Sequence, residues 1–271
     1  MIMNAMDNNT REAMEVDVLV IGGGTAGLTA AYSFMQQAKV KNPDVEPMVV
    51  VLEKGIEIGA HSFSGAVMKV GVLKELFPDF LKQGCPIEAK VKKEEMAFLT
   101  ENLHFSLPII PKPFHNLGNA VVSISKFNRW LGQKCEEVGV NLFPGIAATE
   151  IVFDGDKVVG VITGDKGLNK SCKQKPNFEP GLIIKAKLVI FAEGTRGSLF
   201  RDLESKLNLR AGKNPEVFEE GVKEVIQMPK GSVKPGVVVH TLGWPLSKST
   251  GGSFLYTLAN DQIALGLVTY L

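Results

Sequence analysis

The chain has 271 residues and a formal net charge of +1 at pH 7, and 45% of its residues are hydrophobic, enough for one large or two medium-sized domains. Basic and acidic residues are mixed throughout, so we expect no nucleic-acid partner. No stretch approaches the roughly 20 consecutive apolar residues of a membrane-crossing helix. Residues 1–15 have the features of neither a secretory signal nor a transit peptide, and we expect them to form a disordered lead.

The three cysteines, Cys85, Cys135 and Cys172, are far apart in the chain and form no C-x-x-C pair. Their odd number argues against a disulfide framework, and a reducing, cytoplasmic-type setting fits best. The sequence therefore lacks the dithiol that a pyridine-nucleotide disulfide reductase needs, and it shows no cluster of metal ligands. Cys135 falls on the apolar face of a predicted helix and is expected in the core.

The most informative motif follows an apolar, β-branched run over residues 16–21, which is typical of a buried parallel strand. Gly22, Gly24 and Gly27 then fit the G-x-G-x-x-G spacing of a dinucleotide-binding turn. The first glycine permits the tight turn, the second lets a pyrophosphate approach the backbone, and the third lets the helix lie close to the strand. We expect the phosphates at the N-terminus of the helix that follows.

A second apolar strand, predicted over residues 48–52, ends at Glu53. A carboxylate at this position can accept hydrogen bonds from both hydroxyls of an adenosine ribose. The separation between Gly22 and Glu53 is longer than the usual ~20 residues, so the crossover is expected to carry extra loop over residues 37–46.

Residues 55–66 are dominated by small side chains, so their backbone can pass close to a flat ligand. An apolar stripe follows, and Pro78 is expected to end its helix. Two interpretations stay open for this stripe: a surface helix packed on the core, or an interfacial segment that dips into a membrane. The stripe consists of Val70, Leu73, Leu76, Phe77, Phe80 and Leu81.

Residues 84–119 are rich in proline and are predicted to be mostly loop, with His104 and His115 as surface histidines. A helix is predicted over residues 125–138, and Gly139 is placed to end it.

Three further elements come next along the chain. A strand is predicted over residues 140–143. Residues 151–162 are typical of a β-hairpin that turns at Asp154-Gly155, and residues 166–180 are predicted to be a polar, solvated loop.

Residues 188–199 repeat the order of buried strand, glycine turn and helix, with Glu193-Gly194 at the turn. Taken alone, a simple strand-to-helix connection gives the same pattern. Two such turns suit a long ligand, with its pyrophosphate at one turn and its isoalloxazine ring near the other. The pair of turns therefore favours FAD over a mononucleotide or a bare nicotinamide cofactor.

From residue 218 the pattern changes to successive strands, predicted over residues 221–227, 237–242, 253–258 and 262–268. This pattern is typical of an antiparallel sheet, expected here on the substrate side of a two-domain flavoprotein. Gly251 and Gly252 either expose backbone groups to a ligand or allow a bulge. The chain stops at the end of a strand without a covering helix, so we expect a truncated product or a fragment.

Together these residues resemble the electron transfer flavoprotein–ubiquinone oxidoreductase family, and most closely its N-terminal half. The likeness is carried by residues 22–27, 52–54, 58–66, 74–79, 139–145, 191–199, 240–246 and 251–256. The last two stretches are specific to this family rather than to FAD proteins at large. One departure is Thr250, where family members often carry a tyrosine.

The resemblance implies an α/β fold: a Rossmann-like, glutathione-reductase-type FAD domain over residues 16–212, with an inserted antiparallel quinone domain over residues 213–271 that is incomplete here. It implies electron transfer from reduced electron transfer flavoprotein to ubiquinone through FAD and a [4Fe–4S] cluster, whose ligands are not in this chain. Such a reaction needs no catalytic acid, base or nucleophile, and we interpret His61 and His240 as structural.

By position, the resemblance assigns residues to three sites. The FAD set is Gly22, Gly24, Gly27, Glu53, Lys54, Ser64, Gly65, Glu193 and Gly194. The membrane-contact set is Val70, Leu73, Leu76 and Phe77. The backbone of Gly251 and Gly252 would contact the ubiquinone headgroup.

The resemblance also implies a peripheral location, on the cytoplasmic face of a bacterial inner membrane or the matrix face of the mitochondrial inner membrane. This fragment alone is expected to be inactive, because the family's route needs parts that it lacks. Two alternatives stay open: a related FAD-dependent reductase or dehydrogenase, lipid-reducing or linked to nitrogen fixation, and a non-enzymatic FAD-binding remnant.

Overall fold

The computed structural model describes residues 11–62, 65–246 and 248–271 of the chain. These residues fall into two compact units, and the chain passes from one to the other more than once. The first unit comprises Met1–Ser62 and Asn128–Lys213, and the second comprises Phe63–Phe127 and Asn214–Leu271. The domain boundary expected near residue 213 coincides with one boundary between these units. Residues 63–127, which were expected in the FAD domain, fall in the second unit.

A six-stranded sheet forms the centre of the first unit, in the order β8-β2-β1-β13-β10-β9. β8, β2, β1 and β13 are parallel, and β10 and β9 add an antiparallel hairpin at one edge. The sequence patterns predicted these strands and this hairpin, and both are confirmed. Their bounds are β1 (Ala13–Ile21), β2 (Val49–Glu53), β8 (Asn141–Pro144), β9 (Ala148–Asp154), β10 (Lys157–Thr163) and β13 (Ile183–Phe191).

The start of β1 differs from the disordered lead that we expected over residues 1–15. Ala13 to Glu15 pair with Ile183 to Lys185 of β13. Just before them, Arg11 donates from Nη1 to Asp165 Oδ1 at 2.6 Å. The partners of this segment lie far along the chain, so the local sequence could not reveal them. Residues 1–10 lie outside the described part of the chain.

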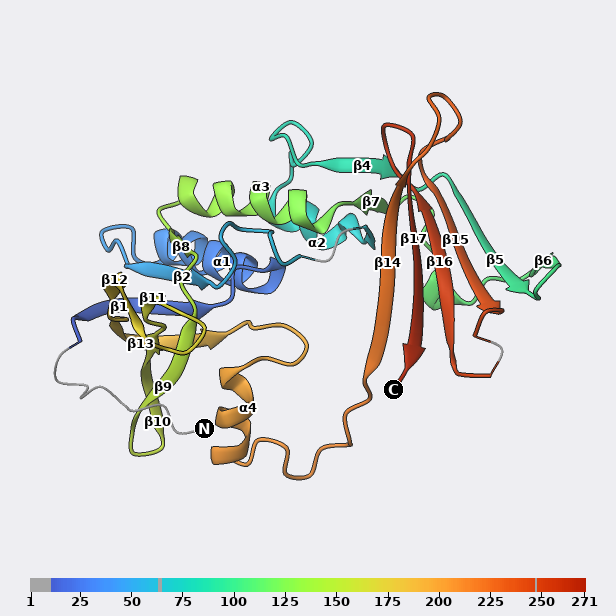
Figure 1. Cartoon of the computed structure of the whole chain (residues 1–271). Helices are drawn as coiled ribbons and strands as arrows, with labels where there is room; N and C mark the ends of the chain where they lie inside the picture. Colours follow the sequence, from blue (N-terminus) through green and yellow to red (C-terminus); the bar gives the residue numbers. More distant parts are fainter. Residues whose placement is uncertain (1–10, 63–64, 247) are drawn as a thin grey trace. The chain divides into compact units, whose positions relative to one another are not determined.

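Helices cover both faces of this sheet (Figure 1). α1 (Thr25–Lys41) buries Leu28 and Met35. α3 (Ile124–Glu137) packs beside it, with Cys135 Sγ donating to Leu28 O at 3.2 Å. The predicted helix and the core position of Cys135 are therefore confirmed. Against the opposite face, α4 (Leu199–Lys206) packs its buried side chains on those of β1.

Residues 166–180 were predicted to be a loop, and this prediction is wrong. They form a two-stranded hairpin of β11 (Lys166–Leu168) and β12 (Gln174–Glu179). At its turn, Asn169 Oδ1 accepts hydrogen bonds from the backbone N–H groups of Ser171 and Lys173. Most side chains of the hairpin are exposed, so no alternation of apolar and polar residues was present to indicate a strand.

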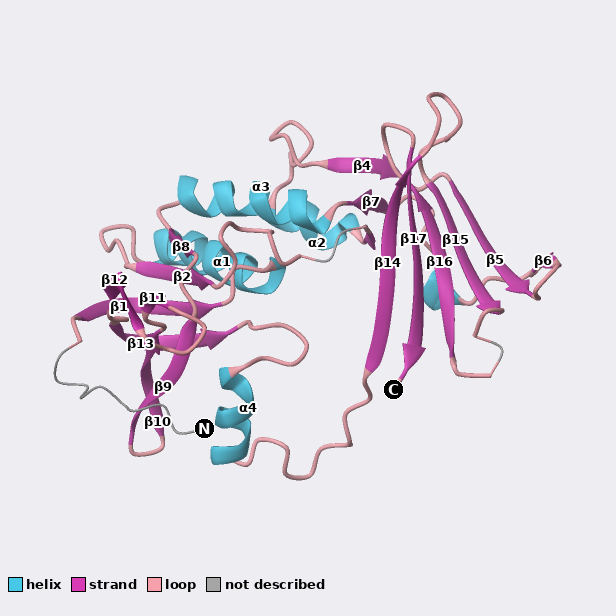
Figure 2. Ribbon diagram, viewed as in Figure 1, coloured by secondary structure: helices cyan, strands magenta, loops and turns pink. Residues whose placement is uncertain are grey.

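The second unit is built on another six-stranded sheet, in the order β14-β17-β16-β15-β5-β6 (Figure 2). All neighbours are antiparallel except β15 and β5, which are parallel. The four predicted C-terminal strands are confirmed. Asn260 and Asp261 turn the chain between two of them, with φ of +56° and +55°, as a type I′ turn requires. The bounds are β14 (Glu219–Gln227), β15 (Val237–Gly243), β16 (Gly251–Thr257) and β17 (Gln262–Tyr270).

The region expected to be mostly loop, residues 84–119, supplies the remaining strands of this sheet, so that prediction is wrong. Its elements are β4 (Ile87–Lys90), β5 (Lys93–Leu99), β6 (His104–Ser106) and the short 3₁₀ helix η2 (Lys112–Phe114), and β7 (Ala120–Val122) follows directly after it. β5 forms a strand because its partner is β15, far along the chain. The hairpin also brings His104 Nε2 to 3.0 Å from Glu95 Oε1, although sequence spacing suggested no such partner.

A three-stranded sheet and a short helix complete the second unit. β3 (Ala66–Met68) and β4 flank β7, and α2 (Val70–Leu76) follows β3. α2 ends with Phe77 at its C-cap, immediately before Pro78, as expected. Val91, Val121, Val238, Leu258 and Ala264 form the core that joins the two sheets of this unit.

Candidate functional site

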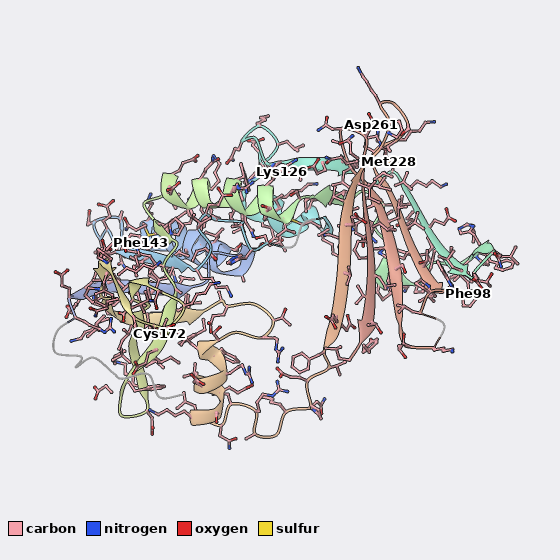
Figure 3. The ribbon with its side chains drawn as sticks, in the orientation of Figure 1. Phe98, Lys126, Phe143, Cys172, Met228 and Asp261 are labelled. Carbon is pink, nitrogen blue, oxygen red and sulfur yellow. The ribbon has the colours of Figure 1, made fainter. Side chains whose placement is uncertain are left out.

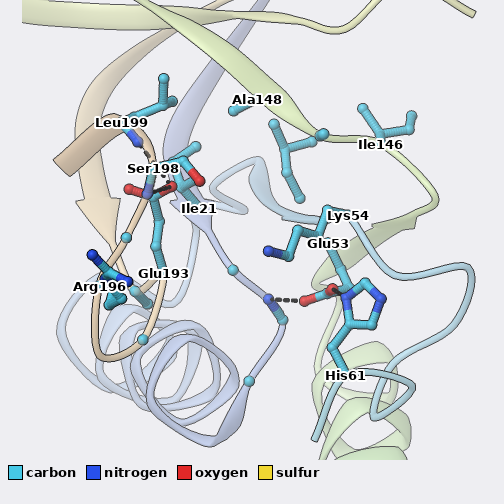
Figure 4. Close-up of a pocket in the computed structure, with 18 of the residues that line it drawn as sticks. Ile21, Glu53, Lys54, His61, Ile146, Ala148, Glu193, Arg196, Ser198 and Leu199 are labelled. Atoms are coloured by element: carbon cyan, nitrogen blue, oxygen red, sulfur yellow. Dashed lines mark hydrogen bonds and ion pairs between the residues drawn. The ribbon is translucent and has the colours of Figure 1, made fainter. Parts of the chain in front are cut away.

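A cavity of about 740 Å³ lies in the first unit, at the carboxyl ends of β1, β2 and β13. α1 leads from β1 to β2 on one side, and β13 pairs on the other, so the cavity sits where an open α/β sheet usually binds its ligand. Figure 4 shows the acidic and basic side chains that reach it. Of the predicted FAD set, Gly22, Gly24, Glu53, Lys54, Glu193 and Gly194 line it.

The glycine turn after β1 has the geometry that its spacing predicted. Gly22 has φ of +110°, and a Cβ there would lie 2.3 Å from Ala192 O. A Cβ on Gly27 would lie 2.0 Å from Gly22 O, so only glycine lets α1 start this close to the strand. A Cβ on Gly24 would meet no described atom within 4 Å. Gly24 therefore presents open backbone toward the cavity that it lines.

The N-terminus of α1 also faces this turn. Gly24 is its N-cap residue, no hydrogen bond from its own side chain is possible, and the first turn contains no acidic residue. A helix N-terminus without a carboxylate keeps its positive potential for an anion. The arrangement can receive a pyrophosphate.

Glu53 braces the glycine turn as well as lining the cavity. Its Oε2 accepts a hydrogen bond from Gly23 N at 2.9 Å, and its Oε1 accepts one from Gly55 N at 2.6 Å. His61 Nδ1 lies 3.7 Å from Oε1. Each carboxylate oxygen has a second lone pair, so Glu53 can still accept from ribose hydroxyls. Figure 4 shows its side chain directed at the glycine turn.

Glu193 has a role that the sequence did not reveal. Its Oε1 accepts from the backbone N–H groups of Ser198 and Leu199, at 3.1 and 3.2 Å. Its Oε2 accepts from Phe200 N at 2.8 Å. This carboxylate thus caps the N-terminus of α4 and neutralises its positive potential. The sequence did contain a signal for this cap, because Glu193 is followed by a glycine turn and then by a helix.

Several residues that line the cavity were absent from the prediction. They include the short run from Ile146 to Thr149, the loop residues Arg196 to Ser198, and Asp202 of α4. The run of small apolar residues carries no recognisable motif, because it contributes shape rather than charge.

Of the other three residues of the predicted FAD set, Gly27 supports the turn from α1 without lining the cavity. Ser64 lies outside the described residues. Gly65 belongs to the second unit, has φ of +77°, and is buried. Its carbonyl oxygen accepts a hydrogen bond from Lys223 Nζ at 2.8 Å.

Gly251 and Gly252 lie within β16 rather than at an interruption of the sheet. They pair with Thr269 and Val268 in unbroken register, so the bulge interpretation is wrong. A Cβ on Gly251 would lie 2.2 Å from Val268 O, and a Cβ on Gly252 would lie 2.7 Å from Thr241 O. Close strand packing therefore explains the glycines, and their contact with a quinone stays a prediction.

The predicted membrane-contact set is only partly exposed. Leu73 and Phe77 have just 5% and 2% of their surface exposed, because their side chains pack into the core. Their burial gives no support to a membrane contact, which stays a prediction for these residues. Val70 and Leu76 are half-buried.

The described residues contain no group of three or more His, Cys, Asp or Glu side chains that could hold a metal ion. Cys85 and Cys135 are buried and Cys172, labelled in Figure 3, is exposed; all three are free thiols. Burial raises the pKa of Cys85 to about 11 and that of Cys135 to about 12. None of the helices in the described segments is long and apolar enough to cross a membrane.

Solved structures place the fold among flavin-dependent proteins. A geranylgeranyl bacteriochlorophyll reductase-like protein from Thermoplasma acidophilum aligns with a TM-score of 0.63 and 19% identity, over 94% of this chain and 57% of that one. A flavoprotein/dehydrogenase from Cytophaga hutchinsonii aligns with a TM-score of 0.61 and 17% identity, over 94% of this chain and 56% of that one. The class is therefore an α/β protein with a Rossmann-like fold and an inserted β-sheet domain, as in these two proteins.

Sequence comparison finds similar proteins that are longer than this chain. An electron transfer flavoprotein–ubiquinone oxidoreductase from Arabidopsis thaliana is 45% identical over 96% of this chain and 41% of its own length. The protein of that name from Homo sapiens is 42% identical over 97% of this chain and 43% of its own length. The probable one from Acinetobacter baylyi is 43% identical over 96% of this chain and 47% of its own length. The chain is homologous to the electron transfer flavoprotein–ubiquinone oxidoreductases, and it spans less than half the length of these relatives.

Two family models match parts of the chain. The family described as ETF-QO, ubiquinone-binding, matches residues 218–271, which hold β14 to β17. The Thi4 family matches residues 1–103.

Proposed function

We propose that this chain binds FAD in the cavity of the first unit and works in electron transfer from reduced electron transfer flavoprotein to ubiquinone. The observation that carries the proposal is the identity of 40–45% to oxidoreductases of that name over nearly the whole chain. The match of a ubiquinone-binding family to β14–β17 supports the same assignment for the second unit.

The residues of the cavity suit FAD. Gly22, Gly24 and the uncapped start of α1 would hold the pyrophosphate, and Glu53 would hold the adenosine ribose. Lys54 and Gly194 line the same cavity and complete the proposed set. Bound FAD would supply the electron-accepting and electron-donating chemistry. The chain supplies the binding groups, and the reaction needs no acid or base from the cavity.

An iron–sulfur cluster does not fit the residues present. A [4Fe–4S] cluster is usually held by four cysteine thiolates, and the whole sequence contains three cysteines. Two of these are buried thiols with raised pKa, which disfavours the thiolate form. No step of the proposed electron transfer is assigned to a cluster in this chain.

A peripheral membrane contact is also proposed, on residues other than those first expected. The β5–β6 hairpin and the loop after it expose large apolar side chains, including Leu103 (60%), Phe105 (51%), Ile109 (76%) and Leu117 (62%). Phe98, labelled in Figure 3, lies on the same hairpin and is 44% exposed. Several exposed apolar side chains in one segment suit a lipid surface, the source of a hydrophobic quinone. The cytoplasmic face of a bacterial inner membrane, or the matrix face of the mitochondrial one, fits this proposal.

Flavin binding is the direct test. The purified chain, mixed with FAD and desalted, should keep a flavin absorbance spectrum, and fluorescence quenching should give a dissociation constant in the micromolar range or below. A colourless protein with intact secondary structure would overturn the proposal.

Liposome co-sedimentation tests the membrane contact. A variant with Leu103, Phe105 and Ile109 changed to Ser should partition at least about tenfold less, because each change removes about 2 kcal/mol of apolar burial. Val40→Ser is the matched control, since Val40 is 77% exposed on α1 in the first unit. Equal partitioning of the triple variant and the wild-type chain would exclude this surface.

A further inference from the structure

A hydrogen-bonded pair of titratable side chains lies on one face of the second sheet. His240 Nε2 is 3.0 Å from Tyr256 Oη, and both side chains are half-buried. β15 and β16 carry the pair, within the segment that matches the ubiquinone-binding family. Neither residue lines the cavity of the first unit.

The register places the pair beside Gly252. His240 pairs directly with Phe254, and Val238 pairs with Tyr256, so these four side chains share one face. Gly252 is two residues from Phe254 in the same strand and therefore lies on that face as well. A quinone headgroup over Gly252 would have Phe254 and His240 as its neighbours along this face.

Aromatic rings surround the pair. Phe254 stacks on Tyr256, with ring centroids 4.7 Å apart and an interplanar angle of 24°. Phe114 of η2 meets the His240 ring edge-on, at 5.1 Å and 62°. Phe254 also covers Gly266, where a Cβ would lie 2.2 Å from its ring. Two polar groups are thus held at fixed positions inside an apolar surface that suits a planar ligand.

The charged groups around the imidazole are few. Glu94 of β5, which is paired with Val238, shares the face, and so does Lys223 of β14, which is paired with Gly266. On η2, Phe114 makes the contact, and His115 at its end bonds to Ile110 O. The three-stranded sheet and the residue after β4 pack Val67, Ala89, Val91 and Val121 into the core that contains Tyr256.

Burial sets the protonation of the pair. It lowers the pKa of His240, although the charge of Glu94 acts in the opposite direction, so the imidazole is neutral at pH 7. It raises the pKa of Tyr256 to about 12, so the phenol keeps its proton. A neutral imidazole beside a protonated phenol can give a proton from one ring nitrogen and take one at the other.

We propose that His240 delivers the protons that a quinone takes up when it is reduced at this face, and that Tyr256 positions and reloads the imidazole. The inference rests on the proposed function, in which reduced FAD supplies the electrons. Reduction turns both quinone carbonyls into hydroxyls and consumes two electrons and two protons. In each of two rounds the Nδ1 proton of His240 goes to a quinone oxygen while Nε2 takes the Tyr256 proton. The pair is then reset: Nδ1 takes a proton from solvent and Nε2 gives its proton back to Tyr256 Oη, so each round delivers one solvent proton to the quinone.

The test follows reoxidation of the flavin in the FAD-loaded chain. Protein reduced with light is mixed in a stopped-flow instrument with a water-soluble, short-chain ubiquinone analogue, from about pH 5 to about pH 9. The same protein is mixed with ferricenium, which accepts one electron and no proton. The variants are His240→Gln and Tyr256→Phe, with His104→Gln as control, because His104 is an exposed histidine of the same unit.

His240→Gln should slow reoxidation by the quinone about 100-fold and remove both its pH dependence and its solvent deuterium isotope effect. Tyr256→Phe keeps the stacked ring and should slow it about tenfold. Reoxidation by ferricenium should be unchanged in both, which also shows that the variants are folded and hold FAD.

Wild-type rate and pH profile in His240→Gln would overturn the inference while leaving the proposed function intact. The inference would also be overturned if the variant slowed reoxidation by ferricenium as much as reoxidation by the quinone, because ferricenium takes up no proton. A wild-type chain that binds no FAD, or whose reduced flavin does not react with the quinone, would instead overturn the proposed function, and this inference with it.

Discussion

The first unit contains two strand–glycine–helix turns that look alike in sequence and differ in structure. The turn after β1 ends at a helix whose cap residue is a glycine, and its first turn has no acid. The turn after β13 ends at a helix whose first N–H groups are held by Glu193. Both helix ends have the same positive potential, but only the first leaves it available to a ligand. The comparison shows that an anion site depends on what already occupies the helix end.

The largest expected effect comes from closing the first turn. Gly27→Ala would place a methyl group 2.0 Å from Gly22 O, a backbone atom that cannot move without shifting β1. The variant should lose about 3 kcal/mol of unfolding free energy and its FAD binding. Urea unfolding followed by circular dichroism measures the first effect. An unchanged midpoint of urea unfolding would mean that α1 can move away from the strand. The first turn would then tolerate an added methyl group.

Gly24→Ala should separate binding from folding at the same turn. The added methyl group meets no described atom within 4 Å, so stability should change by less than about 0.5 kcal/mol. The same methyl group would stand where the phosphates approach, so the dissociation constant for FAD should rise about 10- to 100-fold. Fluorescence titration with FAD checks this. Wild-type affinity would show that the pyrophosphate lies elsewhere.

At the second turn we expect a larger effect on stability than on FAD affinity. Glu193→Ala removes the carboxylate that caps α4 and should cost about 1–2 kcal/mol of stability. Its effect on FAD affinity should be smaller than that of Glu53→Ala, although Glu193 was predicted to bind the cofactor. Thermal unfolding and FAD titration of both variants decide the matter. A large loss of affinity with unchanged stability in Glu193→Ala would restore the original assignment.

The smallest effect concerns the segment that starts β1 and so helps to align the two turns. Arg11 lowers the pKa of the Asp165 carboxyl through their hydrogen bond. A carboxyl whose folded pKa is lowered adds stability above its ordinary pKa of 3.8, and that stability is lost as the pH falls through the folded pKa. Arg11→Met should therefore cost about 1 kcal/mol more at neutral pH than in strong acid, where only the hydrogen bond from Arg11 to Gly181 O is lost. Urea unfolding at several pH values tests this, with Lys187→Met, at an exposed ion pair, as the control.

Sequence patterns were sufficient wherever a signal was local. The strand runs, the Gly22–Gly27 turn and the four C-terminal strands all have the predicted form. β5 was missed because its parallel neighbour, β15, lies far along the chain. The charged segment of β5 also lacks the alternation of apolar and polar residues that indicates a strand. The amphipathic stripe around Leu73 could not be assigned, because a helix on a protein core and one on a membrane have the same apolar pattern.

In the candidate site, residue types were predictable but their partners were not. Glu193 was recognised as an acid at a turn, yet whether it faces a ligand or a helix end depends on the path of the loop to Leu199. The hydrogen bond between His240 and Tyr256 requires the register of β15 on β16, which no short motif specifies.

The interleaved course of the chain sets an order of events during synthesis. β5 leaves the ribosome early, but its neighbour β15 is made about 140 residues later, which takes roughly 7–28 s at the usual 5–20 residues per second. During that time one edge of β5, together with the apolar hairpin it forms with β6, has no sheet to join. This is the interval in which an aggregation-prone edge is exposed, so production of this chain should respond to chaperones that shield nascent strands.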